Sequence, residues 1–236
     1  MRLDKFLSES SCYSRSEVHK LIKKSLIIAD GKVAKTPDTK VTESSVIYVN
    51  NVLIPYKKYV YLMLNKPAGF ISATEDKHDP VVIDLIPDEY KHYNAFPVGR
   101  LDKDTTGLLL LTNDGRFDHA LMSPKSNLYK RYFATLDKDA EEQDIEIFAN
   151  GMEFKDFTAK PAKLEITSNL REVYIEISEG KFHQVKRMCE RVGKNVTSLK
   201  RVAIGNLQLD ETLPLGSVRE LTTDEMTLLN MDYLLK

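Results

Sequence analysis

The spacing of apolar residues predicts a small helical unit at the start of the chain. Apolar side chains recur at helical intervals in residues 3–7 and again in residues 18–22. The segment from Ser14 to Glu17 precedes the second stripe and has the form of a capping box, in which each side chain bonds the other residue's backbone N–H. Asp30 and Gly31 indicate a tight turn between two short apolar runs, and residues 46–49 favour a further strand.

From residue 59 onward the pattern is mostly that of β-strands, after a linker at residues 55–58. Residues 108–111 are uninterrupted and apolar, which is typical of a buried central strand. The other predicted strands are residues 60–64 (followed by a loop at 65–69), 132–136 and 173–177. Apolar positions in residues 185–192 follow helical spacing, and Gly193 can end that helix in a left-handed conformation.

Composition limits the class of protein. The 236 residues are 42% hydrophobic and 29% charged, which is ordinary for a chain that folds around a core. No apolar run approaches the ~20 residues that span a bilayer, and the charged first ten residues do not resemble a secretory signal. Two cysteines are too few for a disulfide framework, and no Cys or His pair has zinc-ligand spacing. We therefore expect a cytoplasmic protein without a metal site.

The net charge of −1 hides an uneven distribution. Residues 1–58 carry a net charge of +5, and the rest of the chain carries −6. Within that acidic part, residues 181–201 hold seven basic residues against one acidic residue, whereas residues 137–156 hold eight acidic against two basic and are expected to face solvent. One basic cluster alone is usually solvated surface. Two of them on an otherwise acidic chain indicate contact with a polyanion such as a nucleic acid.

Residues 99–115 carry the densest chemical signal, because a loop rich in Gly, Arg, Asp and Thr leads directly into the predicted central strand. A carboxylate at the mouth of a buried strand can act as a nucleophile or base, although loop carboxylates more often form turns. The tetrapeptide Arg-Leu-Asp-Lys occurs at both 2–5 and 100–103. Only the second copy precedes a buried strand, so Asp102 is the candidate catalyst, and Asp104 and Asp114 are interpreted as turn residues.

Several motifs together resemble the RsuA/RluB-type pseudouridine synthases. They are residues 99–115, Asn-Lys-Pro-Ala-Gly at 65–69, Tyr-Lys-Arg-Tyr at 129–132, and Ile-Ser-Glu-Gly-Lys-Phe-His-Gln-Val-Lys-Arg-Met at 177–188. Residues 1–50 resemble the αL RNA-binding domain of the ribosomal protein S-four type. Residues 160–165 and 209–222 look closest to the branch that modifies uridine 516 of small-subunit rRNA. The resemblance extends over nearly the whole chain.

The resemblance implies an α+β fold with two domains. Residues 1–58 would be the RNA-binding domain, and residues 59–236 the catalytic domain, with a mixed, mainly antiparallel β-sheet. The implied reaction converts a uridine of 16S rRNA into pseudouridine, without metal or organic cofactor. The substrate would be rRNA or a ribosomal assembly particle. No apolar seam indicates an oligomer, so we expect a monomer.

The resemblance also assigns catalytic roles. Asp102 would attack C1′ of the target nucleotide, or assist loss of uracil through an ion-pair or glycal route. Tyr132 would stack on the base and take the C5 proton. Lys186 would pair with Asp102 and stabilise its ionised form, with Arg187 as the rival for that role. Arg100 would support the flipped nucleotide or its phosphate.

Further basic and polar residues are expected to contact the RNA, because a base must leave its stack to reach such a site and phosphate contacts must offset that cost. Near the site the candidates are Lys181, His183, Gln184, Arg187 and Arg201. In the N-terminal unit they are Arg2, Lys5, Arg15, Lys20, Lys23 and Lys24. A packed structural histidine is an equally good interpretation of His183, and Cys189 is expected in the core.

Two other functions fit the same sequence. The first is the same reaction on a large-subunit rRNA uridine. The second is a ribosome-assembly factor that binds RNA without catalysis, against which the presence of Asp102, Tyr132 and Lys186 argues. A glycosidase would need a second carboxylate across the cleft from Asp102, and the sequence nominates none.

Overall fold

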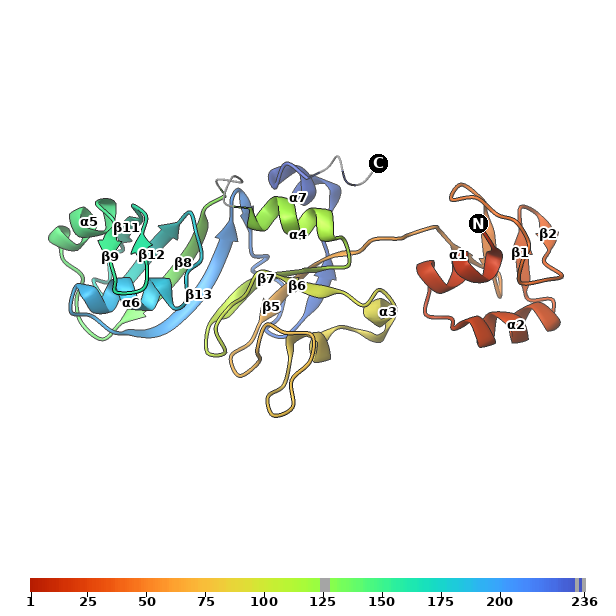
Figure 1. The fold of residues 1–236 in the computed structure, drawn as a ribbon, viewed down its shortest axis with the longest axis horizontal. Helices are drawn as coiled ribbons and strands as arrows, with labels where there is room; N and C mark the ends of the chain where they lie inside the picture. The colour runs from red at the N-terminus through yellow and green to blue at the C-terminus, as the bar shows by residue number, and fades with distance from the viewer. Residues whose placement is uncertain (124–127, 232–233, 235–236) are drawn as a thin grey trace. The chain divides into compact units, whose positions relative to one another are not determined.

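The chain folds into two compact units in the computed structural model, which describes residues 1–123, 128–231 and 234 (Figure 1). One unit contains Met1–Val60 and Ile86–Ala95, and the other contains Tyr61–Leu85 and Phe96–Lys236. Nothing in the local sequence pattern indicated that residues 86–95 group with the first unit. In the described residues, no helix is both long enough and apolar enough to cross a membrane.

The first unit packs two helices against a small antiparallel sheet. Its elements are α1 (Leu3–Ser10), α2 (Arg15–Lys23), β1 (Ile27–Ala29), β2 (Lys32–Val33), β3 (Ile47–Val49) and β4 (Val52–Ile54), with α3 (Asp88–Lys91) in the segment 86–95. The sheet order is β2-β1-β3-β4. Leu3, Phe6 and Leu7 of α1 are fully buried in one core with Val18 of α2, so each helix contributes the apolar stripe that its spacing predicted.

Local signals in this unit are confirmed. The Ser14 hydroxyl accepts a hydrogen bond from the amide of Glu17, and the Glu17 carboxylate accepts one from the amide of Ser14. Asp30 and Gly31 both have positive φ in the turn between β1 and β2. The sequence interpretation missed β4, which follows a second such turn at Asn50 and Asn51.

The second unit is built on a nine-stranded sheet. Its strands are β5 (Tyr61–Lys66), β6 (Phe96–Val98), β7 (Thr106–Thr112), β8 (Lys130–Leu136), β11 (Lys163–Ile166), β12 (Glu172–Ile177), β13 (Val196–Ile204), β14 (Leu207–Gln208) and β15 (Val218–Glu220). The main order is β11-β12-β8-β13-β7-β5-β15, with β14 beside β13 and β6 beside β7. Among the described strands only β13 and β7 pair in parallel, so the expected mixed, mainly antiparallel sheet is confirmed.

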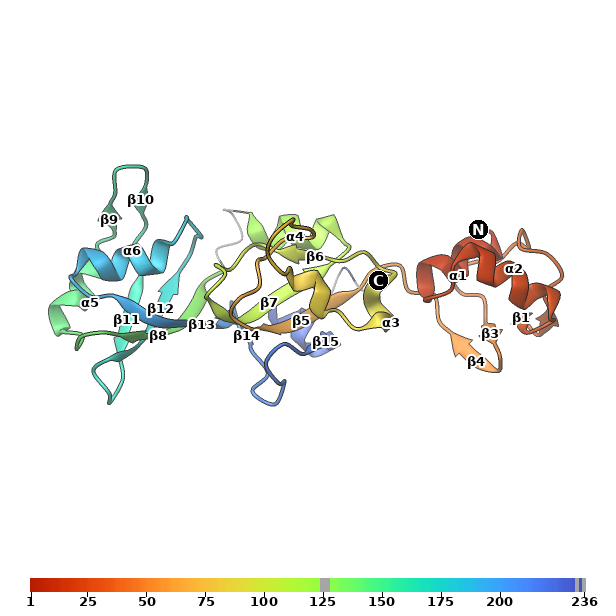
Figure 2. The same cartoon turned by 90° about the horizontal axis from the view of Figure 1, so that it is seen from below.

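Helices and a separate hairpin accompany this sheet. They are the 3-10 helix η1 (Val82–Leu85), α4 (Gly115–Met122), α5 (Glu142–Ala149), α6 (Gln184–Arg191), α7 (Thr223–Leu228) and the hairpin β9 (Met152–Glu153) with β10 (Thr158–Ala159). Both views show α6 lying over the β8–β13 part of the sheet, with the β9–β10 hairpin close to it (Figures 1 and 2). Gly193 has the positive φ predicted for the residue after α6.

Two sequence expectations for this unit are wrong. The strand expected to stop at residue 64 continues to Lys66, whose side chain is therefore carried into the interior. The acidic stretch 137–156 does not simply face solvent, because Asp144 is buried and pairs with the buried Lys194 at 2.8 Å. A buried charge is stable only with such a partner.

Gly107 allows β7 and β13 to run side by side at the point where their parallel pairing begins. Its φ is +98°, and a Cβ built on it would lie 2.2 Å from the backbone oxygen of Arg201. The register pairs these two residues directly. Only glycine fits both the backbone angle and the space.

We expect Gly107→Ala to lower the free energy of unfolding by about 2 kcal/mol or more, since it adds a steric clash to an unfavourable backbone angle. Urea denaturation measures the change. Gly115→Ala is the matched control, because a Cβ at Gly115 meets nothing within 4 Å, and it should change stability by less than about 1 kcal/mol. Equal stability of the two variants would contradict the packing described here.

Candidate active site

The loop of residues 99–105, between β6 and β7, carries Asp102. Ser72 fixes the loop from one side, because its hydroxyl accepts a hydrogen bond from the amide of Leu101 and donates one to the carbonyl of Leu101, both at 3.0 Å. The amide of Thr105 donates to the carbonyl of Asp102 at 3.1 Å and closes a turn. The Asp102 side chain, 28% exposed, is left accessible to a reacting group.

Lys66, at the end of β5, holds the same loop from inside. Its side chain is completely buried, and its ammonium donates to the carbonyls of Pro67, Asp102, Lys103 and Thr105 at 2.9–3.3 Å. Burial lowers the pKa of Lys66 to about 8, against the opposing negative charges of Asp104 and Asp102. Three of these four carbonyls belong to the loop of residues 99–105, so the ammonium defines the path of the loop around Asp102.

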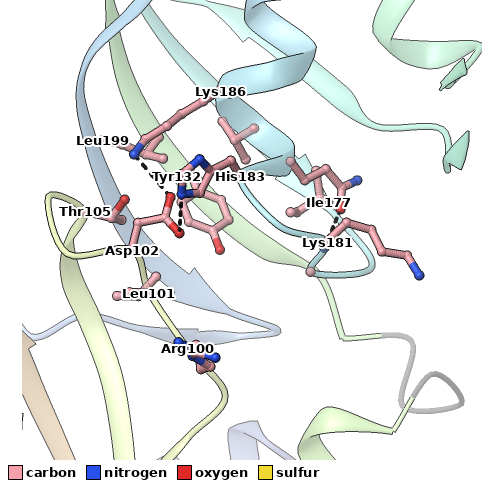
Figure 3. A pocket seen from close by; sticks show the side chains of 13 residues that line it. Arg100, Leu101, Asp102, Thr105, Tyr132, Ile177, Lys181, His183, Lys186 and Leu199 are labelled. Atoms are coloured by element: carbon pink, nitrogen blue, oxygen red, sulfur yellow. Dashed lines mark hydrogen bonds and ion pairs between the residues drawn. The ribbon is translucent and has the colours of Figure 1, made fainter. Parts of the chain in front are cut away.

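Lys186, on α6, reaches the side chain of Asp102, as Figure 3 shows. Its Nζ lies 3.2 Å from Oδ2 of Asp102 and 2.6 Å from Oδ1 of Asp104. Burial acts to lower the pKa of Lys186, but hydrogen bonds to Asp104 and Asp102 outweigh it, and the net pKa is raised. The same contact lowers the pKa of Asp104. Asp104, interpreted from sequence as a turn residue, is thus also a partner of the site lysine.

Arg187, the alternative to Lys186 as the partner of Asp102, pairs with a different carboxylate. Its guanidinium forms an ion pair with Asp156 and lies over the rings of Phe154 and Phe157, with centroid distances of 4.7 and 4.6 Å. These partners come from the turn of the β9–β10 hairpin. Of the two candidates, the structure therefore places Lys186 beside Asp102 and attaches Arg187 to the hairpin.

A pocket opens beside Asp102. Tyr132, on β8, lies in it and is 8% exposed, so its ring is held by the surrounding sheet. The apolar wall is formed by Leu101, Ile177, Val185 and Leu199. Tyr129, close in sequence, is 52% exposed and lines a different cavity. An aromatic ring, apolar walls and a carboxylate form a slot suited to a flat, partly polar base.

Four of the predicted RNA-contacting residues also line this pocket: Arg100, Lys181 and His183, which Figure 3 labels, and Gln184. Nε2 of His183 lies 3.7 Å from Oδ1 of Asp102. The histidine is therefore part of the site, and it is 41% exposed, which excludes the interpretation as a packed core residue.

Two of the expected RNA contacts require correction. Arg201 is 3% exposed, its Nε donates to the carbonyl of Leu108 at 2.8 Å, and its Nη2 is buried, so it does not reach the surface. Gln184 is 2% exposed, and its amide group bonds the backbone of Lys181 and the carboxylate of Glu179. Both side chains stabilise the walls of the site.

The basic residues of the N-terminal unit that are predicted to contact RNA are all exposed. They are Arg2, Lys5, Arg15, Lys20, Lys23 and Lys24. Arg2 pairs with the buried Asp4 at 2.9 Å and Lys5 lies 3.7 Å from Glu9. Exposed cations of this kind have the charge that phosphate contacts require.

Sequence reasoning missed Lys66, Asp104 and Phe182 as site residues. Lys66 belongs to the quoted motif at 65–69, and its position directly after an apolar strand was the available signal. Asp104 stands two residues after Asp102, but only the fold brings Lys186 to both. Phe182 precedes His183 and is 72% exposed beside the pocket.

Comparison with known proteins agrees with this geometry. A family model described as RNA pseudouridylate synthase matches residues 60–191, and an S4 domain model matches residues 1–47. An uncharacterized RNA pseudouridine synthase of Bacillus subtilis is 43% identical over 235 residues, 98% of each chain. Ribosomal small subunit pseudouridine synthase A of Escherichia coli is 38% identical over 230 residues, 96% of this chain and 98% of that one.

A crystal structure of a pseudouridylate synthase has the same fold. It superimposes with a TM-score of 0.68 at 37% sequence identity, covering 97% of this chain and 99% of that chain. The family match covers more than half of the residues, and the similarity to relatives extends from the first unit through the second. The chain therefore belongs to the RNA pseudouridine synthase family and carries an S4 domain at its N-terminal end.

Proposed function

We propose that this enzyme converts uridine 516 of 16S ribosomal RNA into pseudouridine, with Asp102 as the group that starts the reaction. The observation that carries the proposal is the contact of Asp102 with Lys186 at 3.2 Å, beside the pocket that contains Tyr132. The Asp102 carboxylate is the group able to attack C1′ or to remove a proton, and its contact with the ammonium of Lys186 orients it beside the pocket.

The reaction needs one bond to break and another to form at the same ribose carbon. The bond between N1 of uracil and C1′ breaks, assisted by the Asp102 carboxylate through attack on C1′, or through an ion-pair or glycal route. Uracil then rotates between the apolar walls and rejoins C1′ through C5. The proton displaced from C5 passes to Tyr132 or to solvent, and N1 acquires a proton. Atoms balance without an added reactant.

The choice of substrate rests on the relatives and on charge. Relatives in Escherichia coli and Salmonella typhimurium that are 38–39% identical over nearly the whole chain are named ribosomal small subunit pseudouridine synthase A. In this proposal, residues 1–58 bind structured RNA through their exposed basic residues, and residues 59–236 catalyse the isomerisation. RNA of this kind is recognised mainly through its backbone and shape. A ribosomal substrate also places the enzyme in the cytoplasm.

We expect the wild-type enzyme to introduce one pseudouridine into 16S rRNA, at position 516, and the Asp102→Asn variant to introduce none. Asn keeps the size of the side chain but replaces one acceptor oxygen with an NH2 donor and removes the charge needed for attack. Carbodiimide modification followed by primer extension locates the product as a stop. A stop elsewhere in 16S, or only in 23S rRNA, would overturn the assigned position. A stop with Asp102→Asn would overturn the role of the carboxylate.

We expect Lys186→Met to slow the single-turnover rate roughly 10- to 100-fold, the loss that corresponds to one charge-assisted hydrogen bond. Methionine keeps most of the apolar stem, so the pocket wall is retained. Lys103→Met is the matched control, since Lys103 is next to Asp102 in sequence but pairs with Asp79 on the surface. The control should remain within about threefold of wild type. Equal effects of the two substitutions would contradict the pairing.

A further inference from the structure

Phe182 presents an aromatic ring to solvent beside the active site. At 72% exposure it is the most exposed of the large hydrophobic side chains in the described part of the chain. Its ring stacks on the imidazole of His183, with centroids 3.8 Å apart and planes 17° from parallel. The two rings form a short stack whose spacing is close to the ~3.4 Å between successive bases of one nucleic-acid strand.

Hydrogen bonds hold the backbone of the loop that carries this stack. Gln184, buried at the start of α6, accepts a hydrogen bond from the amide of Lys181 at 3.0 Å and donates one to Glu179 at 3.0 Å. Its own amide donates to the carbonyl of Lys181 at 3.1 Å. His183 has φ +51°, an unfavourable angle for a residue other than glycine that these surrounding bonds maintain. The backbone that carries the exposed ring is therefore tied to the start of α6.

The stack continues directly from the reaction centre. Nε2 of His183 lies 3.7 Å from the carboxylate of Asp102, and the same imidazole stacks on the ring of Phe182. Lys181, next to Phe182 in the chain, lines the same pocket and supplies a positive charge for a phosphate. An apolar ring with cationic neighbours at the mouth of a nucleotide pocket matches the chemistry of a base and its backbone.

We propose that the stacked pair of Phe182 and His183 binds the base of a nucleotide adjacent to the target uridine. The inference rests on the proposed function and adds a second base-binding subsite to it. When the target uridine leaves its stack, each flanking base loses its partner on one face. The ring of Phe182 replaces that partner, so the cost of flipping the uridine is reduced. Because every base has a π-face, this subsite favours an unstacked neighbour without specifying its identity.

The test is a double-mutant cycle between the protein and its RNA. The RNA is a 16S fragment around position 516, intact or with the base removed from the nucleotide on the 5′ or the 3′ side of the target. The proteins are wild type, Phe182→Ala, Phe182→Trp and Leu170→Ala. Leu170 is an exposed apolar residue in the turn between β11 and β12 and serves as the control for loss of exposed apolar surface. Equilibrium binding and single-turnover rates are measured for each pair.

We expect Phe182→Ala to raise Kd for intact RNA about 5- to 100-fold, the range for loss of one base–aromatic stack. Phe182→Trp should bind as well as wild type, and Leu170→Ala should not differ from it. With one of the two abasic RNAs, wild type should lose the same factor, and Phe182→Ala should lose nothing further. That coupling is specific to a contact with a base and would not arise from a general weakening of the loop.

Two results would overturn the subsite. One is unchanged binding by Phe182→Ala. The other is that Phe182→Ala and the missing base each raise Kd by a factor that does not depend on the other change, with both abasic RNAs. That result would assign the exposed ring to another partner such as a protein. Failure of the proposed function has a different readout, because wild type would then form no pseudouridine in the intact fragment. The binding cycle would still show whether the ring contacts a base.

Discussion

The buried ammonium of Lys66 is the interaction on which the active site depends. A lysine side chain that is completely buried is costly unless its charge is solvated by the protein. Here three carbonyls of the loop around Asp102 and the carbonyl of Pro67 solvate it, in four contacts of 2.9–3.3 Å. The same contacts satisfy carbonyl groups that have no strand partner in the loop. The same contacts thus stabilise the buried lysine and position the Asp102 carboxylate.

Two lysines contact this loop from different elements of the fold. Lys66 acts from the interior on the backbone, whereas Lys186 acts from α6 on the side chain of Asp102 and also on Asp104. The close parallel pairing of β7 and β13 at Gly107 brings the loop into the same part of the sheet as Tyr132, since β8 lies on the other side of β13. The hairpin holds Arg187, so of these two neighbouring cations of α6 it is Lys186 that contacts the carboxylate.

Local features could be predicted from the sequence, and long-range ones largely could not. The capping box at Ser14 and the helix of residues 185–192 depend on neighbours within one or two turns, so their patterns were sufficient. The contacts of Lys66 with the Asp102 loop span 36 to 39 residues, and that of Lys186 with Asp104 spans 82. No spacing rule connects such positions. The family resemblance brought Asp102 and Lys186 together, but it could not show that Arg201 is buried.

The most direct measurement is the single-turnover rate of Lys66→Met, combined with hydrogen exchange of the Gly69 and Thr105 amides, which donate to the loop carbonyls of Lys103 and Asp102. Methionine fills much of the same space without a cation. We expect the folded variant to bind RNA normally, to exchange both amides faster, and to react about 100-fold more slowly, as for a carboxylate displaced by about an ångström. A variant with the wild-type rate and unchanged amide protection would show that Asp102 is positioned without the buried ammonium.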